Sequence, residues 1–154
     1  MIKTNIDILT IQRCMKNRYP FFMLDGITEA DTMRYANGYK LFSNNEWFFQ
    51  GHFSDDPNVP GAIQLETMIE TFIMTFLLEP EYQGKQTADS KISELCFFRR
   101  IVPGERLDCH AELASLRRGV ATGTVSGTVN GEQACSCKLT VCIPELMIVP
   151  RRNT

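Results

Sequence analysis

Residues 61–78, with the sequence GAIQLETMIETFIMTFLL, decide the fold. Their apolar side chains recur at helical spacing and cover most of the helix circumference, a pattern typical of a helix surrounded by protein. These side chains are Ala62, Leu65, Met68, Ile69, Phe72, Ile73, Met74, Phe76, Leu77 and Leu78. Pro60 suits the threshold of such a helix, and Glu79-Pro80 suits its end. We therefore predict one long buried helix over residues 61–78.

The rest of the chain carries strand patterns separated by turn signals. Asn130-Gly131 lies between two strand-like runs and is a strong hairpin signal, while Pro103-Gly104 and Arg117-Arg118-Gly119 mark further turns. The pattern predicts strands at residues 21–29, 33–42, 88–98, 106–116, 120–129 and 133–143, and a short helix at residues 6–16. The expected fold is α+β, with a curved antiparallel sheet wrapped round the long helix.

Composition fits one domain, residues 1–154, and narrows the function classes. The 16 basic and 18 acidic residues give a formal net charge of −2, which argues against a general nucleic-acid binder. The six cysteines form no Cys-x-x-Cys pair, so we expect reduced thiols and a cytoplasmic protein. Residues 61–78 contain too many polar side chains for a membrane span.

Three features near the start of the long helix together suggest a site. His52 lies in a loop flanked by aromatic residues, Pro60-Gly61 exposes backbone N–H groups at a helix N-terminus, and Glu66 lies five residues further on. Taken singly, each has an ordinary explanation: a surface histidine, a common helix start, and a solvent-facing or ion-paired glutamate. Together they place a base, an anion-stabilising helix end and an acid within fifteen residues, which favours a catalytic site.

Several motifs resemble those of FabZ-type 3-hydroxyacyl-[acyl-carrier-protein] dehydratases. They are Arg18-Tyr19-Pro20-Phe21, Phe48-Phe49-Gln50-Gly51-His52-Phe53, Pro57-x-x-Pro60-Gly61 with Glu66, and Phe97-x-Arg99 followed by Val102-Pro103-Gly104-Glu105. The resemblance runs from about Arg18 to the last predicted strand. Its most specific part is the fourteen-residue spacing from His52 to Glu66. The resemblance implies a hotdog fold, in which the sheet wraps the long helix.

The resemblance also implies roles and partners. His52 aligns with the catalytic histidine, Glu66 with the catalytic acid, and Gly61 with the glycine whose N–H binds the thioester carbonyl. In this family the histidine and the acid of one site come from opposite subunits. A homodimer is then the smallest active unit, and a trimer of dimers is common. The substrate is carried by acyl carrier protein, an acidic partner for which Arg99 and Arg100 are candidate contacts, unless they are ordinary surface charges.

The expected chemistry suits these groups and needs no metal or organic cofactor. Dehydration takes a proton from C2 of a 3-hydroxyacyl thioester and protonates the C3 hydroxyl as it leaves. Imidazole is the expected base, and the Gly61 N–H and the helix end stabilise charge on the thioester oxygen. Glu66 must hold a proton to act as the acid. We expect burial to raise its pKa, because it lies beyond the first helical turn.

Departures from the family pattern affect the expected substrate more than the reaction. Ser54 and Asp55 replace a usual Pro-Gly, Asn17 replaces a frequent histidine, and Glu70 replaces a usual glutamine. Glu70 is expected either to face solvent or to raise the pKa of Glu66. We hypothesise a fatty-acid or polyketide-type pathway with a specialised acyl substrate. Glutamate at position 66, where FabA-type isomerases usually have aspartate, points to a plain dehydratase. The alternatives are another hotdog thioester enzyme, either a thioesterase or an enoyl hydratase, and a non-catalytic hotdog partner subunit.

Overall fold

The computed structural model describes residues 1–147, so residues 148–154 of the predicted domain lie outside the described part. Its centre is helix α2, Gly61–Leu77, which confirms the predicted helix to within one residue. Thirteen of its seventeen residues are buried, as expected for a helix with protein on most sides. Pro60 occupies the N-cap position, so the chain enters the helix in an extended conformation that its fixed φ favours.

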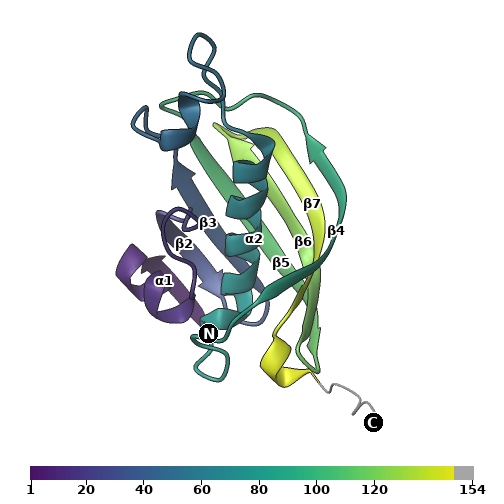
Figure 1. Ribbon diagram of the computed structural model, residues 1–154. Helices are drawn as coiled ribbons and strands as arrows, with labels where there is room; N and C mark the ends of the chain where they lie inside the picture. The colour runs from purple at the N-terminus through teal and green to yellow at the C-terminus, as the bar shows by residue number, and fades with distance from the viewer. Residues whose placement is uncertain (148–154) are drawn as a thin grey trace, which may run out of the picture.

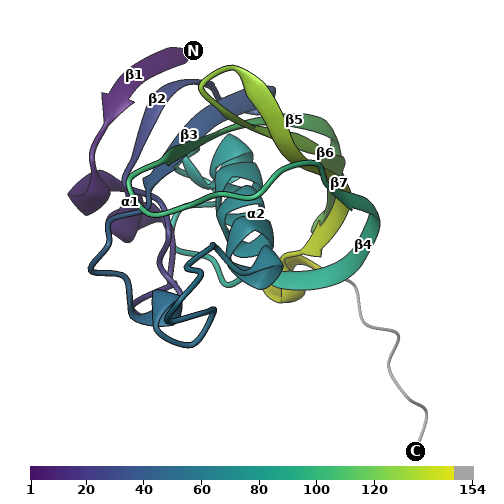
Figure 2. The ribbon, with the colours of Figure 1, turned by 90° about the horizontal axis from the view of Figure 1, so that it is seen from above.

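Seven strands form one sheet in the order β1-β2-β3-β5-β6-β7-β4. All neighbouring pairs are antiparallel. The strands are β1 (Ile2–Ile6), β2 (Gly26–Asp31), β3 (Tyr35–Leu41), β4 (Ala88–Phe97), β5 (Arg106–Arg117), β6 (Val120–Val129) and β7 (Glu132–Cys142). Figure 1 shows α2 lying along the concave face of the sheet, and Figure 2 shows the sheet curving round it. This is the predicted α+β arrangement.

The two hairpin turns of the C-terminal half confirm their sequence signals. Arg118 and Gly119 have φ values of 51° and 76°, and Asn130 and Gly131 have φ values of 50° and 78°. Positive φ at both central residues matches the right-handed twist of the flanking strands. Strands β5, β6 and β7 therefore follow one another closely along the chain and pair in order.

The N-terminal part differs from the prediction. Strand β1 was not predicted, and the helix predicted at residues 6–16 is the shorter α1, Ile8–Cys14, because Ile6 belongs to β1. Strand β2 begins at Gly26 rather than at residue 21. The reason is that the backbone N–H of Met23 donates to the Glu70 carboxyl instead of to a neighbouring strand. Two 3-10 turns, η1 (Trp47–Phe49) and η2 (Pro144–Leu146), complete the described elements.

Strand β4 forms one edge of the sheet and pairs only with β7 among the described strands. Its residues are exposed along most of its length, including Ile92, Leu95 and Phe97 at 38%, 37% and 47%. An exposed edge strand with apolar side chains is a template for pairing with another chain. In residues 1–147 no helix has the length and apolar character needed to span a membrane.

Candidate active site

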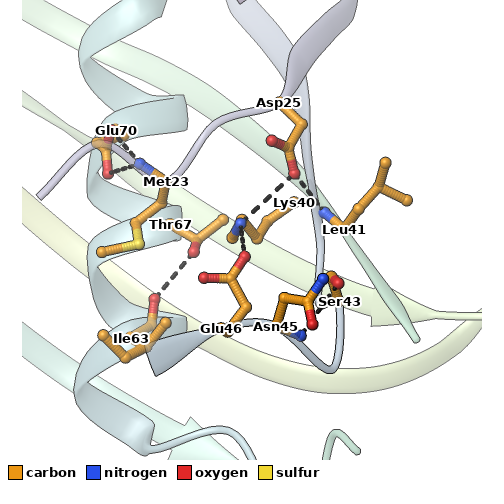
Figure 3. Close-up of polar contacts among 10 residues, drawn as sticks. All are labelled: Met23, Asp25, Lys40, Leu41, Ser43, Asn45, Glu46, Ile63, Thr67 and Glu70. Atoms are coloured by element: carbon orange, nitrogen blue, oxygen red, sulfur yellow. Dashed lines mark hydrogen bonds and ion pairs between the residues drawn. The ribbon is translucent and has the colours of Figure 1, made fainter. Parts of the chain in front are cut away.

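The segment that carries His52 is anchored to the sheet by a buried lysine. Lys40 of β3 is 7% exposed, and its Nζ lies 2.6 Å from Oε1 of Glu46 and 3.6 Å from Oδ2 of Asp25 (Figure 3). Glu46 immediately precedes η1, whose Phe48 ring packs edge-on against Phe42 of the core. A buried charge pair that is fully bonded fixes local geometry, because removing one partner leaves the other uncompensated. The position of η1, from which the His52 loop begins, is therefore fixed relative to the sheet.

Asn58 holds the imidazole of His52 through the backbone in two ways. The Asn58 N–H donates to the His52 carbonyl at 2.9 Å, and the Asn58 carbonyl lies 3.1 Å from Nδ1 of the ring. A carbonyl only accepts, so Nδ1 carries the ring proton and Nε2 keeps a free lone pair. The ring also stacks on Phe53, with centroids 4.5 Å apart. This geometry presents Nε2 as a base.

His52 and Gly61 line the same pocket, which has a volume of about 410 Å³. Gly61 is the first residue of α2, and the Gly61 N–H has no hydrogen-bond partner within residues 1–147. Such orphan N–H groups at a helix N-terminus attract negative charge. The ring of Phe97 covers Gly61 so closely that a Cβ at position 61 would lie 2.8 Å from its Cζ. The pocket thus combines a base with an anion-stabilising donor under an aromatic wall.

A second pocket of about 350 Å³ is also lined by His52 and is mostly apolar. Its walls include Trp47, Phe48, Ala62 and Ile63. An apolar cavity next to a base and an oxyanion donor can accept the hydrocarbon part of a substrate. Both pockets are lined by His52, and its imidazole is the titratable group that they share.

Glu66 lines neither of these pockets. It lies five residues beyond Gly61, a rotation of about 140° round the helix, so it points away from the His52 side. Oε1 of Glu66 accepts a hydrogen bond of 3.2 Å from Nδ2 of Asn17. Burial, and then the charge of Asp89, raises the pKa of Glu66 to about 7, against a smaller lowering by Asn17. The expectation that burial dominates is confirmed, and the geometry leaves His52 and Glu66 of one chain in different places.

Glu70 lies one turn beyond Glu66 and is fully buried, so the alternative that it faces solvent is wrong. Its two carboxyl oxygens lie 2.9 and 3.0 Å from the backbone N of Met23 (Figure 3). Burial raises the pKa of Glu70 to about 9, with the bond from Met23 opposing the rise and the charge of Glu66 adding to it. The like-charge effect therefore acts on Glu70 rather than on Glu66, the reverse of the expected direction. Glu70 is the protonated member of the pair at neutral pH.

Arg99 and Arg100 stand at the rim of the His52 pocket. Arg99 is held by Glu105 at 2.6 Å, and Arg100 forms an exposed pair with Asp56 at 2.5 Å. Arg99 therefore has a structural role between strands. Arg100, with 57% of its side chain exposed, lies at the surface beside the pocket in its pair with Asp56.

Two residues that hold the site were not predicted from sequence. The contribution of Asn58 is a backbone carbonyl, which leaves no sequence signal. Asn17 was noted only as a departure from the family, and its contact with Glu66 crosses 49 positions in the chain. The amide of Asn17, next to the Arg18-Tyr19 step, was the available clue, because such side chains donate to carboxylates.

Comparison with known proteins identifies the family. Residues 15–138 match the family model described as a FabA-like domain. The chain is 34% identical over 134 residues to the 3-hydroxyacyl-[acyl-carrier-protein] dehydratase FabZ of Clostridium novyi, covering 87% of this chain and 94% of that protein. It is 32% identical over 142 residues to the FabZ of Staphylococcus haemolyticus, covering 92% of this chain and 98% of that protein. The chain therefore belongs to the FabA-like family, and its FabZ relatives confirm the FabZ-type resemblance that its motifs predicted.

A solved structure shares the fold. The dehydratase heterocomplex ApeI:P from Xenorhabdus doucetiae matches with a TM-score of 0.74 and 13% identity, covering 87% of this chain and 90% of the matched chain. A Haemophilus influenzae thioesterase matches less closely, with a TM-score of 0.55 and 14% identity, covering 76% of each chain. At such identities the likeness concerns the fold alone. It supports the predicted hotdog arrangement.

Proposed function

We propose that the chain is a 3-hydroxyacyl-[acyl-carrier-protein] dehydratase that converts its substrate to a trans-2-enoyl thioester. The observation that carries this proposal is the shared pocket of His52 and Gly61, in a chain whose curated relatives are FabZ dehydratases. In the proposed reaction, Nε2 of His52 takes the C2 proton. The Gly61 N–H stabilises charge on the thioester oxygen, and Glu66 protonates the departing C3 hydroxyl.

The acid and the base of one site come from two copies of the chain. Glu66 lies within the electrostatic reach of Asp89 at the start of β4, whereas the His52 pocket is lined by Phe97 at the end of the same strand. If two β4 edges pair antiparallel about a twofold axis, the start of one strand lies beside the end of the other. That pairing brings Glu66 of one chain toward the partner's His52 pocket and also covers the exposed apolar residues of β4.

The protonation states fit this division of labour. With a pKa of about 7, roughly half of the Glu66 side chains hold a proton near neutral pH, so the group can act as an acid. His52 is held by Asn58 in the tautomer that leaves Nε2 free to accept a proton. After water leaves, the proton on His52 returns to Glu66 through solvent, and the site is ready for another catalytic cycle.

The substrate arrives on an acyl carrier protein. Arg100, which is exposed beside the pocket and paired with Asp56, is the candidate contact for this acidic partner. The adjoining apolar pocket accepts part of the acyl chain. The changes at Ser54, Asp55 and Glu70 support a dedicated fatty-acid or polyketide-type pathway, and acyl chain length is the property in which this enzyme should differ from its FabZ relatives.

An assay with 3-hydroxyacyl carrier-protein substrates of several chain lengths tests the proposal. Formation of the enoyl thioester is followed by mass spectrometry in the wild type, His52→Ala, Glu66→Gln and His110→Ala. The last is a matched control, because His110 is the only other histidine and lies on the outer face of the sheet, bonded to Asn37 and Glu112. We expect the first two variants to lose activity and His110→Ala to keep it. A wild type that releases free thiol instead would be a thioesterase, and one inactive on every substrate would support a non-catalytic subunit.

A further inference from the structure

The segment between α1 and β2 donates hydrogen bonds to both carboxyl groups of helix α2, those of Glu66 and Glu70. Asn17 donates to Glu66, and six residues later the Met23 N–H donates to Glu70. Between these contacts the Arg18 guanidinium ties the turn together by donating to the carbonyls of Gln12, Met15 and Asn17 at 2.7–2.8 Å. The backbone of Asn17 is thus held by Arg18, and its side chain is held by the contact with Glu66.

We propose that Asn17 is a positioning residue for the catalytic acid, one that fixes which oxygen of Glu66 delivers the proton. The side-chain nitrogen of Asn17 can only donate, so the Oε1 atom it contacts must accept. The proton of the acid form then lies on Oε2, and in the proposed reaction this is the oxygen that delivers it to the leaving hydroxyl. This role rests on the proposed function, because it gives Glu66 the part of the acid.

The charged groups near Glu66 do not orient its carboxyl, so its orientation depends on Asn17. Asp89 lies on β4 and its charge opposes ionisation of Glu66, while Glu70, one turn along α2, has both carboxyl oxygens on the Met23 N–H. Lys40 lowers the pKa of Glu70 through its charge, and its ammonium group is paired with Glu46 and Asp25. Among the contacts described here, Asn17 is the single donor on the Glu66 carboxyl. Since a donor favours the ionised form, Asn17 also limits how far burial raises the Glu66 pKa.

The test replaces the donor with a side chain of similar size. Asn17→Leu removes the hydrogen bond and keeps the branched shape of the side chain, Asn17→His restores an N–H donor, and exposed Lys16→Ala is the matched control in the same segment. Two readouts are taken: kcat and KM against pH, and the Glu66 pKa from carbon-13 NMR of labelled glutamate carboxyls, assigned by difference with Glu66→Gln. The NMR titration does not depend on catalysis.

We expect Asn17→Leu to lower kcat by roughly 10- to 100-fold, with KM little changed, since misplacing a reacting group costs rate rather than affinity. In Asn17→Leu, the alkaline limb of the plot of kcat against pH and the Glu66 pKa measured by NMR should both move to higher pH. In Asn17→His, both should lie close to their wild-type values. A variant that only loosened the fold would lose activity equally at all pH values.

The two proposals fail in different ways. An active wild type in which Asn17→Leu leaves kcat and the Glu66 titration unchanged overturns the positioning role and spares the dehydratase assignment. A wild type that is inactive on every substrate, with a Glu66 pKa that still responds to Asn17→Leu, overturns the dehydratase assignment. It also removes the role in proton delivery, although the hydrogen bond itself would stand.

Discussion

Removing the charge of Asp89 should shift the upper pH limit of catalysis downward. In the proposed reaction Glu66 acts as the acid only while protonated, and its pKa of about 7 is raised first by burial and second by Asp89. With that pKa, the protonated fraction is about a half at pH 7, about a tenth at pH 8 and about a hundredth at pH 9. The wild-type rate should therefore fall about tenfold for each pH unit on this limb.

Asp89→Asn keeps the size of the side chain and deletes its negative charge. The Glu66 pKa then falls toward its ordinary value, so the alkaline limb moves to lower pH, while the rate well below the limb stays close to wild type. The assay is the initial rate of enoyl formation at saturating substrate across the pH range, with exposed Ser90→Ala as the neighbouring control. A limb that stays in place in Asp89→Asn, or that persists unchanged in Glu66→Gln, would refute the assignment of this limb to Glu66.

Three further predictions concern stability and carrier-protein recognition. Because burial raises the folded-state pKa of Glu70 to about 9, the stability it confers is present below the ordinary pKa and is lost as pH rises toward about 9. The free energy of unfolding of Glu70→Gln, measured in urea, should therefore rise relative to that of the wild type between about pH 5 and about pH 9. An equal difference between the two proteins at about pH 5 and at about pH 9 would contradict this. Fully buried Phe72→Ala should cost about 3–5 kcal/mol of unfolding free energy, against little for half-exposed Phe53→Ala; equal losses would refute the core assignment. Arg100→Ala should lower kcat/KM for carrier-protein substrates in low salt but not for a small acyl thioester, and equal effects on both would remove its role in docking.

The sequence predicted the elements whose signals are local. The repeat of apolar residues in 61–78 identified α2, because a buried helix needs them on most of its faces. The Asn130-Gly131 hairpin was also predictable, because few residues adopt positive φ at two successive positions. Strand β1 had no such signal, since only Ile6 of its five residues is buried and the strand is defined by pairing with β2.

The site was predictable to the extent that its motifs are contiguous. His52 and Gly61 were expected together, and the structure places them at one pocket. The Asn58 carbonyl could not be predicted, because any residue supplies that group. The partners of Glu70 and Glu66 depend on a segment about fifty positions away, so their contacts follow from tertiary packing alone. The catalytic roles of His52, Gly61 and Glu66 remain predictions that the experiments above test.

The most direct test of the shared site is a complementation experiment with His52→Ala and Glu66→Gln. The two chains are co-expressed with different tags, and the mixed dimer is isolated by both tags in turn. A twofold dimer with shared sites then contains one site with both groups intact and one site with neither. We predict that the mixed dimer regains about half the wild-type activity, while each variant alone stays inactive. A mixed dimer as inactive as its parents, beside an active wild type, would contradict a site built from His52 of one chain and Glu66 of the other.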